Sequence, residues 1–240
     1  MEDTQMAVPI LETEAVFFTD TARVQAHFSV PNAVVRYTID GTEVSETSNI
    51  YSRPLVLEQT TTVRAKAFHP QFISGPSSSL QVVRTNDLLA DAAITLRPGP
   101  SERYAGSGAQ ALNDGAKGTM AFGNDSAWLG FNVDTLSLGV ALPKARKISK
   151  VTLSSLVHHG AWIFAPAQIT VFHRGDEIGS LALPAPQEGD AVQFAFLEVP
   201  LLPGAYDRFT VRVSSLSQIP DWHQGQGSLP WFFVDEILVE

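Results

Sequence analysis

A short stretch near the C-terminus combines three side chains that together could bind a sugar. Asp221, Trp222 and His223 follow a proline and precede the run Gln224–Gly227, which predicts an irregular surface loop. A sugar ring offers an apolar CH face and a rim of hydroxyls, so its sites pair an exposed aromatic ring with a few donors and acceptors. This loop is therefore the sharpest candidate for carbohydrate binding.

A second aromatic loop, His158 to Trp162, offers the same kind of chemistry. Its adjacent histidines could suggest a metal, but neighbouring strand residues point to opposite faces, so we do not expect them to share an ion. The two tryptophan loops could instead pack against each other or against a neighbouring domain. The candidate ligand-binding residues are Trp222, His223, Asp221, Trp162, His158 and His159.

Two acidic segments from distant parts of the chain could hold a cation. The Asn113–Gly115 turn can present carbonyl oxygens and the Asp114 carboxylate to one point, and a C-terminal strand supplies Glu236. A hard cation such as Ca²⁺ takes about six to eight oxygen ligands, and two carboxylates would balance its charge. The alternative is a plain turn and a solvent-exposed glutamate.

Short runs of alternating apolar and polar residues must position these groups. The alternation Val35, Tyr37, Ile39 and the alternation Val63, Ala65, Ala67 are typical of strands with one buried face. Helical periodicity is nearly absent. Further strands are expected at Leu80 to Val83, Leu136 to Leu142, Val151 to Leu153, Ile169 to Val171, Val192 to Phe196, Phe209 to Val213 and Phe232 to Val239. This pattern predicts an all-β fold of sandwiches or barrels.

Composition narrows the class of partner. The formal net charge is −9, with 16 basic residues scattered among 25 acidic ones, which argues against a nucleic-acid partner. No run approaches the roughly 20 apolar residues of a membrane span, so membrane insertion is not expected. The start Met1–Thr4 lacks an export signal, which suggests a truncated sequence from a longer protein.

Catalysis is not expected from the distribution of acidic groups. Glycoside hydrolysis needs two carboxyl groups flanking one bond, whereas the acids here lie singly in turns and at strand ends. No Ser-His-Asp arrangement occurs with a strand-turn-helix context that would expose a nucleophile. We therefore interpret the chain as a binding or structural protein.

A break near Thr85–Asp87 predicts two domains, residues 1–86 and 87–240. The order of Tyr37–Glu43, Tyr51–Leu55 and Thr61–Phe68 in the first half resembles the chitobiase/β-hexosaminidase C-terminal domain, an immunoglobulin-like sandwich. That family occurs at the ends of secreted bacterial glycoside hydrolases. The resemblance implies a spacer or packing role without catalysis.

The second half resembles the discoidin-like, coagulation-factor C-type sandwich, also known as a galactose-binding-like jelly roll or family 32 carbohydrate-binding module. The motifs are Ala109–Thr119, Trp128–Phe131 and Trp231–Glu240, and the resemblance covers roughly residues 90–240. His158–Pro166 and Pro220–His223 are similar to modules that trail family 20 β-hexosaminidases. The resemblance implies a structural Ca²⁺ held by side chains of Asp114, Thr119 and Glu236 and by backbone carbonyls of Ala111, Ala116, Thr119 and Asp235.

Two hypotheses of different class follow. The chain is either a carbohydrate-binding accessory region of a glycosidase such as a β-N-acetylhexosaminidase, with the catalytic domain in cis, or a structural spacer that touches no sugar. Both predict an extracellular, periplasmic or cell-surface location, while the missing export signal leaves a cytoplasmic origin open. An independent adhesion protein is a third possibility.

Overall fold

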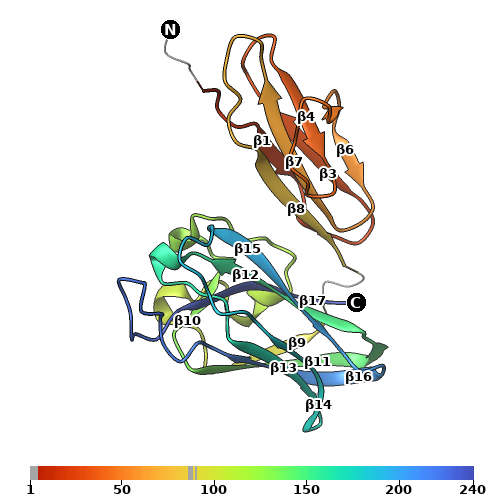
Figure 1. Ribbon diagram of the computed structural model, residues 1–240. Coiled ribbons are helices and arrows are strands. Elements are labelled where there is room, and N and C mark those ends of the chain that lie inside the picture. The colour runs from red at the N-terminus through yellow and green to blue at the C-terminus, as the bar shows by residue number, and fades with distance from the viewer. Residues whose placement is uncertain (1–4, 86–88, 90) are drawn as a thin grey trace. The chain divides into compact units, whose positions relative to one another are not determined.

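The computed structural model describes residues 5–85, 89 and 91–240, and the chain divides into two compact units, Met1–Thr85 and Asn86–Glu240. The expected boundary lay after residue 86. Each unit is built from β-sheets, which confirms the predicted all-β fold class (Figure 1). The helical segments in the described part of the chain are short 3-10 turns, none of which could span a membrane.

The first unit is a sandwich of two sheets. One sheet has the order β1-β3-β6 and consists of β1 (Ile10–Thr13), β3 (Ala22–His27) and β6 (Leu55–Leu57). The other has the order β2-β8-β7-β4-β5 and consists of β2 (Phe17–Phe18), β8 (Ser78–Arg84), β7 (Thr61–Phe68), β4 (Val34–Thr38) and β5 (Asn49–Ile50).

The core of the first unit follows the predicted alternation. Val63, Ala65 and Ala67 of β7 are buried while the residues between them are only partly covered, as expected for a strand with one face on the core. Val63 forms a core cluster with Val24 of the other sheet and with Val82 of the neighbouring strand β8, both fully buried. Burial of this apolar surface holds the two sheets together.

The prediction for Ile39 was wrong. Strand β4 ends at Thr38, and Ile39 is 50% exposed instead of continuing the buried face. The Asp40 carboxylate accepts hydrogen bonds from the backbone N–H and the hydroxyl of Thr42, which turns the chain out of the strand. Gly41 has φ +75°, so glycine is required at the turn.

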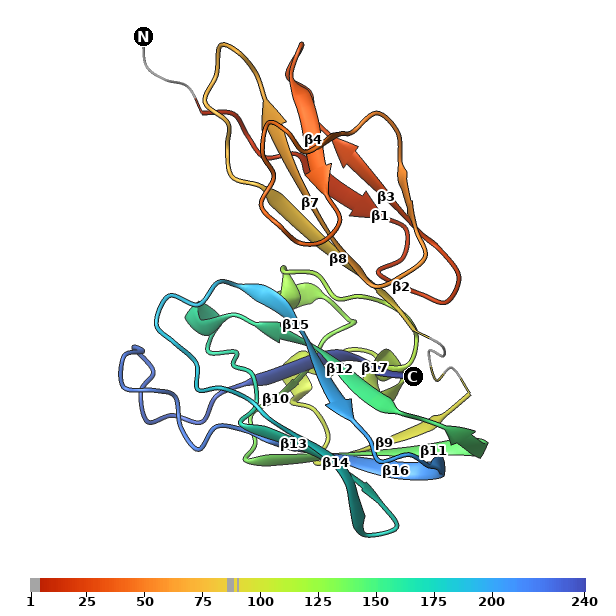
Figure 2. The same ribbon diagram turned by 45° about the vertical axis from the view of Figure 1, so that its right-hand side comes forward.

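The second unit contains a four-stranded and a five-stranded antiparallel sheet, stacked as two layers in Figure 2. The four-stranded sheet has the order β10-β17-β12-β15, with β10 (Leu129–Phe131), β17 (Phe232–Val239), β12 (Lys150–Val157) and β15 (Gln193–Pro200). The five-stranded sheet has the order β14-β13-β16-β11-β9, with β14 (Asp176–Ala182), β13 (Gln168–His173), β16 (Ala205–Ser214), β11 (Thr135–Lys147) and β9 (Ala93–Arg97).

Strand β17 is buried along its whole length, unlike a strand with one solvent face. Its side chain Ile237 packs in the main core of the unit, together with Leu112 of the 3-10 turn η2 (Gly108–Leu112). Phe233 belongs to a separate buried cluster with Trp128, Leu156 and Ile163. The register against β12 shifts between Ser154 and Ser155, which leaves Asp235 as an extra residue in β17. Two adjacent carboxylates, Asp235 and Glu236, are consequently both inside the protein.

Candidate functional site

The two tryptophan loops predicted from the sequence are joined in the structure. The first follows β12 and contains η4 (His159–Ala161), and the second connects β16 to β17. Trp231 donates its backbone N–H to the carbonyl oxygen of Trp162 at 2.9 Å, and Phe164 donates to the carbonyl oxygen of Trp231 at 2.9 Å. These bonds make the loops one continuous rim of the second unit.

His223 is the side chain that fastens the two loops. It is buried, and its Nδ1 accepts a hydrogen bond from the backbone N–H of Gly225 at 3.0 Å. An acceptor at Nδ1 places the hydrogen of the neutral ring on Nε2, which donates to the carbonyl oxygen of His159 at 2.9 Å. His223 therefore holds the rim together instead of facing a ligand.

Aromatic rings surround this histidine. His159 stacks on Phe164 with centroids 4.4 Å apart, and Trp222 lies 5.5 Å from His159 and 6.3 Å from Phe164. Burial among these rings lowers the pKa of His159. Trp222 is half-buried and Asp221 is exposed, so this part of the rim offers an aromatic surface beside a carboxylate.

Trp162 occupies a strained position on the same rim. Its φ of +65° lies in the left-handed region, which is rare for a bulky residue and is held here by backbone hydrogen bonds to His159 and Trp231. A Cβ on Gly225 would lie 2.9 Å from the Trp162 ring, so only glycine fits there. The loops fix the indole position, with the ring half-buried.

His158 is directed elsewhere. Its ring makes an edge contact with Phe122 at 5.9 Å, whereas His159 lies with Phe164 and Trp222. The structure thus brings five of the predicted residues to one rim: Asp221, Trp222, His223, His159 and Trp162. The ring of His158 contacts Phe122 instead of Phe164 and Trp222.

A His223→Ala variant is expected to lose about 1–3 kcal/mol of unfolding free energy, because two hydrogen bonds between the loops disappear and buried polar groups lose their partner. Urea unfolding followed by tryptophan fluorescence measures this loss, since all four tryptophans lie in the second unit. Asp221→Ala on the same loop is the control and should change stability by less than about 0.5 kcal/mol. Equal effects of the two variants would contradict the role of His223.

The Asp114 turn and Glu236 meet inside the second unit. The backbone N–H of Gly115 donates to Glu236 Oε2 at 2.8 Å, and the Asp114 carboxylate accepts from Ala116 N–H at 2.8 Å. Glu236 is fully buried, so the alternative of a solvent-exposed glutamate was wrong. Burial raises the pKa of Glu236 to about 9, and the neighbouring Asp114 and Asp235 add to this rise.

A buried ammonium group lies next to this turn. Lys117 Nζ is 2.6 Å from Asp235 Oδ2 and lies over the rings of Trp128 at 4.2 Å and Phe194 at 3.9 Å. The same carboxylate oxygen accepts the Gly118 N–H at 2.7 Å. Burial raises the pKa of Asp235 and lowers that of Lys117.

Other expected calcium ligands have different partners. The hydroxyl and N–H of Thr119 both donate to Asp125 Oδ2, and its carbonyl oxygen accepts the indole N–H of Trp128. Trp128 itself is 1% exposed, as expected for a core position. Ala111 is buried at the end of η2, and Ala116 lies in the Asp114 turn. Across residues 5–85, 89 and 91–240, no three His, Asp or Glu side chains form a metal-binding group.

The buried carboxylates nevertheless fit a cation. Glu236 Oε1 and Asp235 Oδ1 are buried without a hydrogen-bond partner among the described residues. An ionised carboxylate in such a place needs a compensating charge; Lys117 forms its direct ion pair with Asp235 and acts on Glu236 only through a smaller long-range attraction. Oxygens of Glu236, the Asp114 turn and nearby carbonyls match the preference of Ca²⁺.

Sequence reasoning missed Lys117 and Phe164. The Lys117 ammonium stands in a Gly-rich turn, where a solvated lysine is the usual outcome, and nothing local signals its burial. Phe164 stacks on His159, yet the residues around it show no alternation of apolar and polar side chains that would have predicted its burial.

Fold and sites together define a pair of β-sandwich modules whose aromatic and acidic groups lie on loops and in one covered strand. Within the first of them, residues 14–79 match the model of the Chitobiase/beta-hexosaminidase C-terminal domain. This match confirms the resemblance predicted for the first half.

Several solved structures are similar to the chain. A fucose binding module of Streptococcus pneumoniae is 10% identical with a TM-score of 0.42, over 65% of this chain and 94% of that module. A Clostridium perfringens module in complex with GalNAc-β-1,3-galactose is 13% identical with a TM-score of 0.40, over 63% and 96%. A chitosan-binding module of a Paenibacillus chitosanase/glucanase is 12% identical with a TM-score of 0.37, over 64% and 98%. No curated protein sequence matches the chain.

Proposed function

We propose that this chain is a non-catalytic accessory region of an extracellular or periplasmic glycoside hydrolase, and that its second unit binds carbohydrate. The observation that carries the proposal is the rim where Trp222 and Trp162 are held half-buried by His223 and Gly225. A fixed indole loses little entropy when a sugar ring stacks on it. Asp221 beside Trp222 supplies an acceptor for sugar hydroxyls.

The first unit supports the accessory role. Its family bears the name of the C-terminal domain of chitobiase and β-hexosaminidase, so a β-N-acetylhexosaminidase is the parent enzyme we propose. A catalytic domain in the same polypeptide would be the partner in cis, and glycan would be the partner in trans.

The second unit is further proposed to hold a structural Ca²⁺. Asp114 and Glu236 would supply the carboxylates, and the carbonyl oxygens of Ala111 and Ala116 would complete the set. The bound ion would offset the buried charge of Glu236 and fasten the 113–119 segment to β17. Thr119 and Asp235 contribute less in this proposal, because their side chains are bound to Asp125 and Lys117.

Calorimetric titration of the full chain with galactose, N-acetylglucosamine and N-acetylgalactosamine tests carbohydrate binding. For the sugar that binds, Trp222→Ala is expected to lower the affinity by about tenfold or more, because the aromatic face is lost. Trp222→Phe retains an aromatic face and serves as the matched control. Folded protein that binds none of the three sugars, or equal affinities of both variants, would contradict the proposal.

A spacer without sugar binding is the second candidate, and the packing of the rim favours it. Trp222 contacts His159 and Phe164, and Trp162 contacts His223, so both indoles already have protein partners. If the chain is a spacer, the same titrations show no binding, while Trp222→Ala lowers the unfolding free energy of the second unit.

A further inference from the structure

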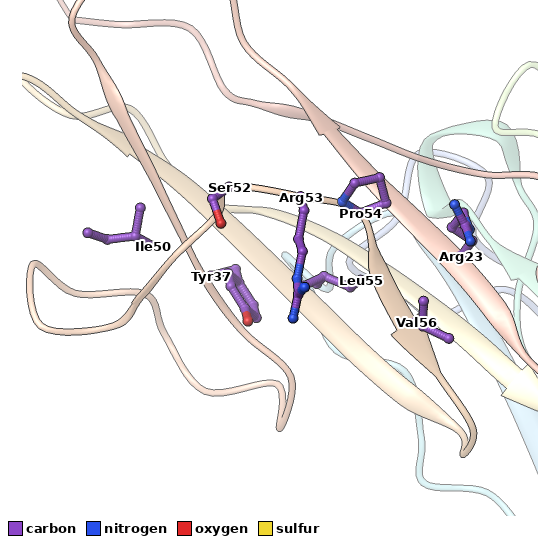
Figure 3. Close-up of a pocket in the computed structure, with 8 residues that line it drawn as sticks. All are labelled: Arg23, Tyr37, Ile50, Ser52, Arg53, Pro54, Leu55 and Val56. Carbon is purple, nitrogen blue, oxygen red and sulfur yellow. The ribbon is translucent and has the colours of Figure 1, made fainter.

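The first unit contains a hollow of about 690 Å³ at the open flank between its two sheets. It is lined by Arg23, Tyr37, Ile50, Ser52, Arg53, Pro54, Leu55 and Val56 (Figure 3). The lining comes from β3, β4, β5, β6 and the 51–54 loop that crosses from one sheet to the other. Nothing in the proposed function uses this hollow.

Two arginines of the hollow are available to a ligand. Arg36, Arg64 and Arg84 of the same unit each donate to a protein oxygen. The side chains of Arg23 and Arg53 have no ion pair or hydrogen bond within the described part of the chain. The lining includes no Asp or Glu, although the chain carries a net charge of −9. The local charge therefore favours an anion.

The backbone at Arg53 is restricted by its neighbours. Pro54 restricts the backbone of the residue before it to extended conformations, and Tyr51 anchors the loop by donating its N–H to the Val35 carbonyl oxygen at 2.8 Å. In Figure 3 the Arg53 side chain reaches from this loop toward the space between Tyr37 and Leu55. A guanidinium in this space can bind a carboxylate with two parallel hydrogen bonds.

Arg53 is a better anchor than Arg23. Arg23 is the register partner of Val56 and lies on the right of Figure 3, beyond Pro54. It also borders a smaller hollow with Glu12 and Glu14. Those two carboxylates compete for its charge. Arg53 has no acidic residue beside it in either hollow.

The remaining lining suits a sugar ring. The Tyr37 ring is half-buried and fixed by an edge contact with Tyr51, so it offers a rigid apolar surface and a hydroxyl. Ser52 adds a second hydroxyl, and Ile50 and Val56 are 57% and 56% exposed at the border. The strands at this flank, β5 and β6, have two and three residues and are too short to pair with a peptide strand.

We propose that this hollow is a second binding site, which takes a carboxylate-bearing saccharide such as a uronic acid unit, with Arg53 on the carboxylate and Tyr37 under the ring. The choice of a saccharide rests on the proposed function of the chain. The anion preference rests on the two arginine side chains without partners in the described part of the chain and on a lining without Asp or Glu.

Titration of the full chain with a galacturonic acid trimer and with the neutral galactose trimer of the same linkage tests the site. Backbone amide signals of Tyr37, Ser52 and Arg53 in NMR spectra are expected to shift with the acidic trimer only. The tryptophan indole signals report the second unit separately, because all four tryptophans lie there. Indole shifts without Arg53 shifts would leave the proposed function intact and overturn this site.

Arg53→Ala is expected to lower the affinity for the acidic trimer by about ten- to a hundredfold. Arg53→Lys should lower it by less, because lysine keeps the positive charge but lacks the planar fork of the guanidinium. The control is Lys144→Ala, which removes one positive charge from an exposed position of the second unit. Unchanged affinity of Arg53→Ala, equal binding of the neutral trimer, or equally tight binding of a polyglutamate peptide would each overturn the assignment.

Discussion

A Lys117→Met variant is expected to lose about 3–5 kcal/mol of the unfolding free energy of the second unit, the usual cost of removing one partner of a buried ion pair. Lys117 is 7% exposed and Asp235 fully buried, with Nζ and Oδ2 2.6 Å apart. Methionine fills most of the volume of lysine, so the loss comes from the charge. The ammonium also leaves the faces of Trp128 and Phe194, which adds to the cost.

Urea unfolding followed by tryptophan fluorescence measures this loss, and Lys144→Met at an exposed position is the matched control, expected within about 0.5 kcal/mol of the parent. A Lys117→Met/Asp235→Asn double variant should recover part of the stability, because the amide needs no counter-charge and can still accept from Gly118 N–H. If Lys117→Met and Lys144→Met have the same unfolding free energy, the Lys117–Asp235 ion pair contributes nothing to stability.

Much of the fold could be predicted because its strands carry their own signal. The alternation at Val63, Ala65 and Ala67 marks a face that packs on the core, and the apolar run Phe232–Val239 coincides with β17. Strand β14 was not predicted, since Asp176–Ala182 mixes charged and small residues and is fixed by pairing with β13 instead. Pairing energy of this kind depends on the partner strand.

The site could be predicted only as far as residue types allow. Loop composition indicated that Trp222 and Trp162 lie on a rim, but the burial of His223 depends on a carbonyl oxygen of His159, far away in the sequence. Likewise, Glu236 could have been solvated or buried. Glu236 is buried because the 113–119 segment covers β17. The two segments lie far apart in the sequence, so only the tertiary structure brings them together.

Calcium is expected to raise the melting temperature of the second unit, and EDTA is expected to lower it. At a free concentration of about 100 times the dissociation constant, a single bound ion would add about 2.7 kcal/mol. The gain should grow as the pH rises, because Glu236 must lose its proton before it can bind the ion. An unchanged melt after thorough EDTA treatment would contradict the site.

The metal-free protein should show the opposite pH trend. Burial raises the pKa of Glu236 from its ordinary 4.5 to about 9, so between these values the folded unit holds a proton that the unfolded chain has released. Stability therefore falls as the pH rises through this window, by up to about 1.4 kcal/mol per pH unit, and is fully retained below pH 4.5 as far as this group is concerned.

Glu236→Gln separates the two effects, since the amide resembles the protonated acid, carries no titrating proton and cannot supply an anionic ligand. In EDTA the variant should lose the pH slope that Glu236 causes and equal or exceed the parent in stability near pH 8. In calcium it should gain little while the parent gains most. If calcium stabilises Glu236→Gln as much as the parent, the ion is bound elsewhere, and the buried carboxylate beside the Asp114 turn has no part in holding it.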